Sequence, residues 1–327
     1  MDATWIWIAF NVFVVGMLAL DLGVFHRQAH SVSVKEATWW SVVWIGLALL
    51  FNVGIYFYWQ QLFPQSDYTN QEAAVAFLTG YLIEKSLSVD NVFVFVLIFG
   101  SFMVPSQYQH RVLFWGVLGA LLMRGAMIAA GAALLAQFHW IIWIFGAFLI
   151  YTGIRMVFVD SHGGDPTQSS VVKLLRRVMP VTEGYEGQKF FVRRDGLLMA
   201  TPLLAVLLVV EVSDVIFAVD SIPAIFAVTN DPFIVYTSNV FAILGLRSLY
   251  FVMAGAMGSL RYLKPALAFI LTFVGIKMLT PDVSKLLVGE KLHIPVTWSL
   301  GIIVATLVIA VVASLRNPET PSESAAH

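Results

Sequence analysis

The chain has 327 residues, of which 59% are hydrophobic and only 12% are charged. Soluble domains carry about 25% charged residues, so this composition excludes an ordinary soluble enzyme. The formal net charge of -1 gives no basic surface for nucleic acid, and the absence of cysteine excludes disulfides, iron-sulfur clusters and thiolate metal sites. Any metal ion must therefore be bound by oxygen or nitrogen atoms.

Apolar segments long enough to cross a membrane recur along the whole sequence. A hydrocarbon core about 30 Å thick takes about 20 residues of helix to cross. The pattern predicts an all-α polytopic membrane protein with about nine transmembrane helices. The predicted spans are residues 3–24, 37–59, 72–103, 111–136, 139–159, 196–228, 233–257, 262–280 and 294–315.

Lysine and arginine lie in every second loop, and short basic loops stay in the cytoplasm. Basic residues follow the first, third, fifth, seventh and ninth predicted spans, whereas the opposite loops hold only Lys285 and Lys291. This distribution predicts an N-terminus outside the cytoplasm and a C-terminus inside it. The long cytoplasmic loop contains SSVVKLLRRVMP, whose spacing predicts an amphipathic helix at the membrane interface or on the protein surface.

Two parts of the chain resemble each other, which indicates an internal repeat. The matched positions are Glu84 and Asp90 with Asp214 and Asp220, Arg124 with Arg247, and FLIYTGIRM (148–156) with ILTFVGIKM (270–278). Each copy contains three spans, and three spans cannot return the chain to its starting side. We therefore expect two inverted three-helix repeats, spans 3–5 and 6–8, as in many secondary transporters, with a substrate site at the midplane. The alternative is a duplicated scaffold that transports nothing.

The spans and the repeat together predict how the chain is organised. Its parts are two N-terminal transmembrane helices at 1–60, the first repeat at 72–159, a cytoplasmic loop at 160–195, the second repeat at 196–280, a last transmembrane helix at 294–315 and a disordered tail at 316–327. The third and sixth spans are longer than the membrane requires, so we expect them to be tilted or broken. Pro223 favours a break in the sixth span, just after Asp220.

Ionisable residues inside the spans mark the candidate site. They are Glu84, Asp90, Glu211, Asp214 and Asp220, with Lys85, Arg124 and Arg247 as gating or counter-charges. Each charge at a helix centre costs about 2.5 to 3.5 kcal/mol, so these groups must be paired, protonated or metal-bound. One divalent cation would cancel the excess of carboxylates, as would protonation of two acids. Oxygen ligands suit magnesium, calcium or manganese. The arginines could equally hold helices together by fixed ion pairs.

At these residues the sequence resembles the TerC family of bacterial integral membrane proteins, and its Alx-type members in particular. The resemblance rests on FLTGYLIEKSLSVDNVFVF, on GLLMATPLLAVLLVVEVSDVIFAVDSIPAIFAVTNDPFIVYTSNVFAILGLRSLYF and on GIKML, and it covers nearly all of residues 35–315. The family name refers to tellurite resistance, while Alx-type members are associated with alkaline pH and manganese export. The resemblance implies a manganese site formed by Glu84, Asp90, Asn91, Glu211, Asp214 and Asp220.

The sequence thus favours a manganese exporter of the bacterial inner membrane, with the N-terminus periplasmic and the C-terminus cytoplasmic. Mn²⁺ would be the transported substrate and protons the counter-ion, and no organic cofactor, nucleic acid or enzymatic activity is expected. There is no P-loop lysine motif for nucleotide hydrolysis. The alternatives are a calcium or sodium antiporter and a non-transporting scaffold in tellurite resistance. An intramembrane aspartyl protease is less favoured because the sequence has no GxGD motif.

Overall fold

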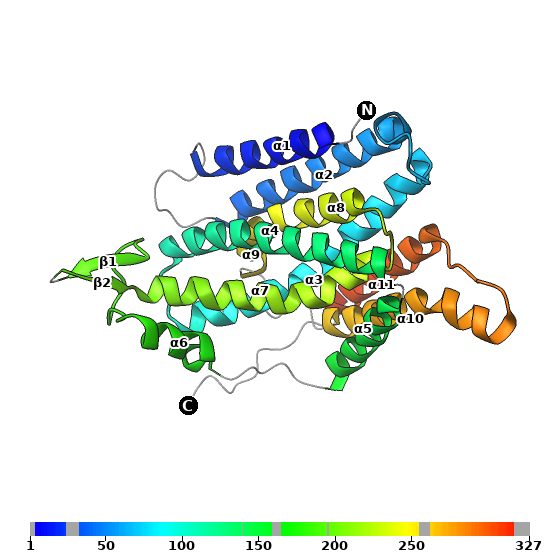
Figure 1. Cartoon of the computed structure of the whole chain (residues 1–327). Coiled ribbons are helices and arrows are strands. Elements are labelled where there is room, and N and C mark those ends of the chain that lie inside the picture. The colour runs from blue at the N-terminus through cyan, green and yellow to red at the C-terminus, as the bar shows by residue number, and fades with distance from the viewer. Residues whose placement is uncertain are drawn as a thin grey trace.

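The computed structural model describes residues 4–23, 33–138, 140–158, 165–194, 196–254 and 262–316, without the side chains of residues 21–23 and Asp90 (Figure 1). The predicted tail lies outside these residues, except for Arg316. The helices are α1 Thr4–Gly23, α2 Val34–Leu62, α3 Asn70–Ser101, α4 Ser106–Gln137, α5 Ile141–Phe158, α6 Ser170–Val178, α7 Pro202–Phe226, α8 Pro232–Leu244, α9 Leu246–Ala254, α10 Leu263–Val288 and α11 Val296–Arg316. A 3-10 turn, η1, spans Pro166–Gln168, and strands β1 Phe191–Arg194 and β2 Leu197–Ala200 form an antiparallel hairpin.

In the described part of the chain, seven helical segments are long and apolar enough to cross a membrane: α2, α4, α5, α7, α8 with α9, α10 and α11. The protein is therefore a polytopic helical membrane protein. Helices α1 and α3 occupy the other two predicted spans. The apolar described part of α1 is shorter, and α3 contains ionisable residues in its middle. Nine membrane crossings remain a prediction.

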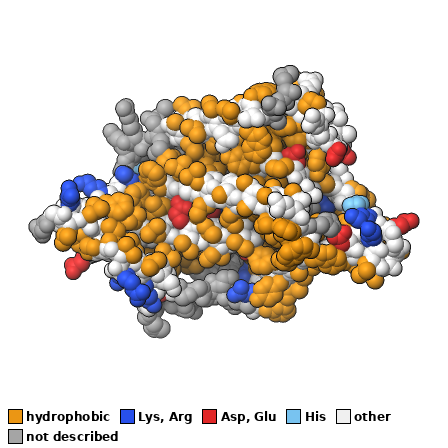
Figure 2. All heavy atoms as spheres, viewed as in Figure 1, with side chains coloured by type: hydrophobic (Ala, Val, Ile, Leu, Met, Phe, Trp, Pro, Cys, Tyr) orange, Lys and Arg blue, Asp and Glu red, His pale blue; other side chains and the backbone are white. Residues whose placement is uncertain are grey.

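Polar and apolar parts of the molecule are separated along the helix axes. The hairpin and α6 lie at one end of the helix bundle, and the connection between α10 and α11 lies at the other (Figure 1). Hydrophobic side chains cover most of the middle of the visible face, whereas lysine and arginine gather at its two ends (Figure 2). A protein that spans a bilayer needs this distribution, because charged side chains belong in the aqueous layers.

The expected amphipathic helix forms as α6 in the long loop, with Val172 and Leu175 buried on one face. The loop also contains the hairpin, which the sequence pattern did not predict, so the sixth span begins at Pro202 rather than at 196. The hydroxyl of Tyr185 donates a hydrogen bond to the carbonyl of Phe102 at 2.8 Å and so fastens the loop to the end of α3. Burial raises the pKa of the Tyr185 hydroxyl to about 12.

The expected break beside Asp220 is wrong, because α7 continues through Pro223 as far as Phe226. Pro223 lies in the last turn of α7, with only three helical residues after it. The interruption lies instead at Gly245, between α8 and α9. A Cβ at Gly245 would lie 2.6 Å from Nζ of Lys85, so the absence of a side chain leaves room for the ammonium.

Glycines bring α5 and α10 into close contact. A Cβ on Gly153 would lie 2.7 Å from the carbonyl oxygen of Ala268, and one on Gly275 would lie 2.8 Å from the carbonyl oxygen of Gly146. Gly153, the later residue of α5, therefore faces Ala268, the earlier residue of α10, and the earlier Gly146 faces the later Gly275. The two helices are antiparallel, and small residues let their backbones approach, as is common in membrane proteins.

Helix α3 packs along α8 in the same direction. Gly80 faces Ser238, because a Cβ on this glycine would lie 2.9 Å from the serine Oγ, and Lys85 donates further along to the carbonyl of Ala242 at 3.5 Å. The later residue of α3, Lys85, contacts the later residue of α8, Ala242, so these helices are parallel. The pair α4 and α7 has the same arrangement, because Gly116 faces Val210 and the more distant Gly131 faces Phe226.

Candidate functional site

Arg124 of α4 holds together an ion-pair cluster in the interior of the bundle. Its Nε and Nη2 donate to Oδ2 and Oδ1 of Asp214 at 3.0 and 2.9 Å. Its Nη1 pairs with Oε1 of Glu84 and also contacts Oγ of Ser221 at 3.3 Å. The guanidinium fork thus joins α3, α4 and α7, and Arg124 is only 2% exposed. We call Glu84, Arg124 and Asp214 the Arg124 cluster.

The Arg124 cluster contains more negative than positive groups. Two buried carboxylates share one guanidinium, which leaves one negative charge if both are ionised. The second oxygen of Glu84, Oε2, is buried and has no hydrogen-bond donor within the described residues. Buried polar atoms in proteins are nearly always satisfied. A water molecule, a proton or a bound cation would each satisfy this oxygen.

A cavity of about 320 Å³ adjoins the Arg124 cluster. Its polar lining comes from Asn91 of α3, Thr152 and Arg155 of α5, and Asp220 and Ser221 of α7. Oγ1 of Thr152 and Oδ1 of Asp220 are hydrogen-bonded at 3.2 Å. Ser221 belongs to this cavity and also contacts Arg124, so the cavity and the cluster are neighbours. We call this space the Asp220 cavity.

Glu211 lies on α7, one helical turn before Asp214. Its carboxylate rests directly against Gly119 of α4, where any larger residue would overlap it. Glu211 is half-buried, whereas Asp214 is 2% exposed. A bulkier residue at position 119 would displace this carboxylate, so Gly119 fixes the place of Glu211.

The structure thus divides the predicted metal site into parts. It brings Glu84 and Asp214 onto Arg124, and it places Asn91 and Asp220 in one cavity. Asp90 lies on α3, and its side chain is outside the described part. Among the side chains that are described, no three histidine, aspartate or glutamate residues form a group that could hold a metal ion. The six-residue metal site remains a prediction.

The three predicted counter-charges have different surroundings. Arg124 is an ion-pair partner, and Lys85 reaches a backbone carbonyl beside Gly245. Arg247 is buried in α9. Whether any of the three acts as a gate remains a prediction.

Three polar residues of the site were not predicted from the sequence. Ser221 and Thr152 are ordinary helix residues by pattern, although Ser221 follows Asp220 directly. Arg155 had a usable signal, because it belongs to the repeated GIRM segment. Hydroxyl groups inside apolar helices carry no periodicity that separates a ligand from a residue bonded to its own backbone.

Comparison with known proteins agrees with the sequence pattern. Residues 69–321 match the integral membrane protein TerC family. The chain belongs to the TerC family. A Myxococcus xanthus relative named "Uncharacterized membrane protein STKORF319" is 50% identical over 98% of this chain and 95% of its own length. Relatives named "Putative membrane-bound redox modulator Alx" include one from Salmonella typhi, 50% identical over 94% of this chain and 92% of its own length, and one from Escherichia coli strain K12, 49% identical over 93% and 92%. No solved structure matches the chain.

Proposed function

We propose that this TerC-family protein exports divalent metal ions from the cytoplasm across the bacterial inner membrane. The observation that carries the proposal is the Arg124 cluster, where a buried carboxylate oxygen of Glu84 has no donor in the described part of the chain and negative groups outnumber positive ones. Asp214 alone would balance the charge of Arg124, so Glu84 adds a carboxylate that charge balance does not require. A cation that passes through the bundle would need it.

The directions of the helices support alternating access between two inverted copies. In the proposed repeat, α3 corresponds to α7 and α4 to α8. A two-fold axis that exchanges the copies would place α3 on α7 and α8 on α4. It would therefore turn the parallel pair α3 and α8 into the parallel pair α7 and α4. The antiparallel contact of α5 with α10 would lie on the same axis.

Individual contacts support the same symmetry. Gly80 faces Ser238 and Val210 faces Gly116. Val210 lies as far along the chain from Gly80 as Asp214 does from Glu84. Each contact is therefore the image of the other under the repeat found in the sequence. On this arrangement the Arg124 cluster lies between the copies, with Glu84 from the first and Asp214 from the second.

The Asp220 cavity supplies the oxygen atoms that a divalent cation prefers. Asn91 offers an amide oxygen, Asp220 a carboxylate, and Thr152 and Ser221 hydroxyl groups. Such ligands suit Mg²⁺, Ca²⁺ and Mn²⁺ alike, so Mn²⁺ is proposed from the family resemblance and not from the ligands. Protons that compete for the same oxygens would provide the driving exchange. The relatives named as redox modulators raise a second role, but this chain contains no cysteine to carry thiol chemistry.

The proposal is tested by metal flux into proteoliposomes that contain the purified chain. Asp220→Asn and Asp90→Asn should each abolish Mn²⁺ transport, because each keeps the size of the side chain and removes its charge. Asp165→Asn, at an exposed turn in the long loop, should transport normally. Wild-type flux in both Asp220→Asn and Asp90→Asn, at equal protein content, would contradict the proposed site.

Ion competition in the same vesicles separates the alternatives. An excess of Ca²⁺ or Na⁺ should not replace Mn²⁺ as cargo if manganese is the substrate. Flux of calcium or sodium without manganese would favour the antiporter of another ion. A membrane scaffold would show no flux of any of these ions, even when correctly folded.

A further inference from the structure

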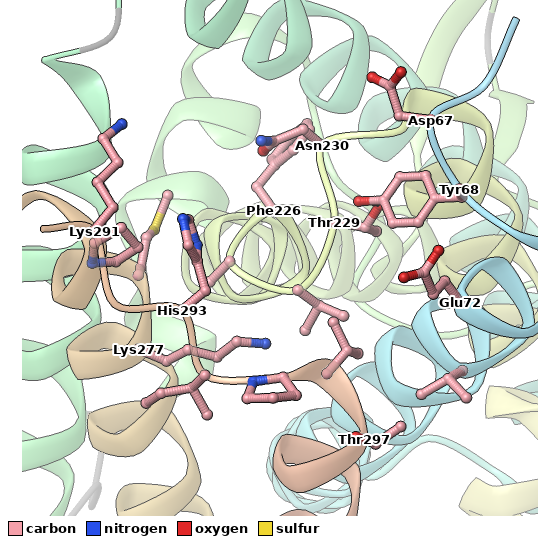
Figure 3. Close-up of a pocket in the computed structure, with 18 of the residues that line it drawn as sticks. Asp67, Tyr68, Glu72, Phe226, Thr229, Asn230, Lys277, Lys291, His293 and Thr297 are labelled. Atoms are coloured by element: carbon pink, nitrogen blue, oxygen red, sulfur yellow. The ribbon is translucent and has the colours of Figure 1, made fainter.

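Lys277 and Lys85 both lie inside the helical bundle, and their surroundings differ. The side chain of Lys277 extends from α10 into a cavity of about 780 Å³, whose lining includes the carboxylates of Asp67, Glu72 and Asp282 (Figure 3). Such a cavity has room for water, and its acids supply opposite charge. Lys85 lines neither this cavity nor the smaller one described above, and it forms no ion pair with a side chain that the structure describes. Another group must therefore compensate its charge.

The ammonium of Lys85 lies at the interruption between α8 and α9. Its Nζ donates to the carbonyl of Ala242 at 3.5 Å, and a Cβ on Gly245 would lie only 2.6 Å from it. Because α8 ends at Leu244, Ala242 is one of the last four residues of the helix, whose carbonyl groups have no amide partner within it. These carbonyls carry the negative end of the helix dipole. Lys85 thus brings a positive charge to the place where α8 needs donors.

The place that the proposed repeat relates to this one has neither the interruption nor the lysine. At the offsets of the matched acids and arginines, Lys85 corresponds to Val215 and Gly245 corresponds to Leu122. Leu122 lies within α4, which is one continuous helix. The lysine therefore accompanies the interrupted helix, and a valine accompanies the continuous one. This pairing is what we expect if the interruption itself requires the ammonium.

Helix α3 uses consecutive residues for two different partners. Glu84 pairs with Arg124 of α4, whereas Lys85 turns to the end of α8. Consecutive residues of a helix point about 100° apart, so the two contacts do not compete. The charge of Lys85 is therefore not part of the Arg124 cluster.

We propose that the carbonyl end of α8 is a binding site for an ammonium-type cation, and that the side chain of Lys85 fills this site as a tethered ligand. The α8 and α9 helices together form one segment long enough to cross a membrane, and lipid offers no donors to a carbonyl at such an interruption. Lys85 supplies these donors and so lets α8 end within the segment. It is thus a positioning residue for α9, which carries Arg247. The inference does not depend on metal transport.

The test uses the full chain in maltoside micelles and the variant Lys85→Ala, which removes Cγ, Cδ, Cε and Nζ. Propylammonium supplies the same atoms as a free cation, and propanol supplies the same carbon chain without charge. Tetramethylammonium chloride, which has no N–H donor, keeps the ionic strength constant. The thermal unfolding midpoint of Lys85→Ala should lie below that of the wild type and rise saturably with propylammonium, because this ligand binds only the folded state.

The same midpoint should not rise with propanol, and the wild type should respond to neither compound because its site is full. Lys285→Ala is the matched control, because Lys285 is exposed on α10. It should keep the wild-type midpoint and show no rise. Equal rises with propylammonium and propanol in Lys85→Ala would show simple filling of space and overturn the proposal. So would the absence of any rise. If Lys85→Ala does not fold alone, the yield of folded protein replaces the midpoint, and the proposal requires a gain with propylammonium only.

Gly245→Ala tests the site with Lys85 in place. The new Cβ would take the space of the ammonium, so the midpoint should fall in the wild-type background. It should not fall in the Lys85→Ala background, where the nearest remaining atom is Cβ of Trp44 at 3.4 Å, an ordinary contact distance. The two single variants and the double variant form a cycle that measures this coupling. Equal effects of Gly245→Ala in both backgrounds would contradict the proposed seat of the ammonium.

Discussion

At the scale of single residues, the Arg124 cluster combines the desolvation cost of buried charges with a specific hydrogen-bond geometry. Burial of charged groups is expensive, and their mutual attraction repays it only when geometry and hydrogen bonding are good. The two-pronged contact with Asp214, at 2.9 and 3.0 Å, has that geometry. The removal of one partner should therefore lower the stability strongly, because it would leave the remaining charges buried and unpaired.

Arg124→Leu should lower the free energy of unfolding by about 3 to 5 kcal/mol, because it strands two carboxylates in the interior. Unfolding by a denaturing detergent, followed by circular dichroism, measures the effect. Arg176→Gln on the exposed face of α6 serves as the control and should change little.

The triple variant Arg124→Leu, Glu84→Gln, Asp214→Asn separates charge from packing. It should recover most of the lost stability, because no buried charge remains. A triple variant as unstable as Arg124→Leu alone would show that the arginine acts through its volume and not through its ion pairs.

The sequence indicated the members of this site but not their partners. Acids and arginines inside apolar spans stand out by their cost alone, and this identified Glu84, Arg124 and Asp214. Their pairing depends on how α3, α4 and α7 are rotated and shifted against one another. No local pattern carries that information, so Ser221 and Thr152 were missed.

At the scale of elements, helix positions followed the sequence closely and helix interruptions did not. A run of apolar residues determines where a membrane helix lies, because unpaired backbone groups are not tolerated in lipid. Pro223 lies inside α7, which continues past it to Phe226, so Pro223 proved a poor marker of a break. Gly245 lies at the interruption, and its missing side chain leaves room for Nζ of Lys85, a tertiary contact that the sequence pattern does not reveal.

The close crossing of α5 and α10 should be sensitive to a single methyl group. Gly153→Ala and Gly275→Ala each place a Cβ within 3 Å of backbone atoms of the partner helix, which cannot swing aside as a side chain would. We expect each to lower the free energy of unfolding by about 1 to 3 kcal/mol.

Gly54→Ala on α2 is the matched control, because a Cβ at this position would have no neighbour within 4 Å. It should leave stability unchanged or raise it by up to about 1 kcal/mol, since alanine favours helix more than glycine. The same detergent titration compares all three variants. Equal stability of the three would mean that α5 and α10 do not cross at these glycines.

At the scale of the whole molecule, membrane topology decides whether the two copies are inverted. Cysteine introduced at Gln65 or at Ser169 should react with an impermeant thiol reagent from opposite sides of the membrane, with Ser169 on the cytoplasmic side. The chain contains no other cysteine, so labelling reports the introduced position alone. Labelling of both positions from the periplasm would contradict the inversion.

Manganese binding should weaken as the pH falls. In the proposed metal site, protons and Mn²⁺ would compete for the same carboxylate oxygens, so metal binding would release protons and its affinity would rise with pH. Titration of Mn²⁺ affinity in detergent between about pH 6 and 9 measures this, and a pH indicator inside liposomes follows proton counter-movement during flux. Constant affinity without proton movement would leave a uniporter or another coupling ion as the better account.

The Arg124 cluster also limits how the two proposed copies could move relative to each other. It joins α3 and α4 of one proposed copy to α7 of the other. A rotation that separated these groups would cost about as much as the loss of a buried ion pair, roughly 3 to 5 kcal/mol. This cost would recur in every transport cycle. A rotation that pivots on them costs far less. The guanidinium then acts as a fulcrum: displacements are smallest beside it and grow toward both ends of the helices, where openings to the two compartments would have to form.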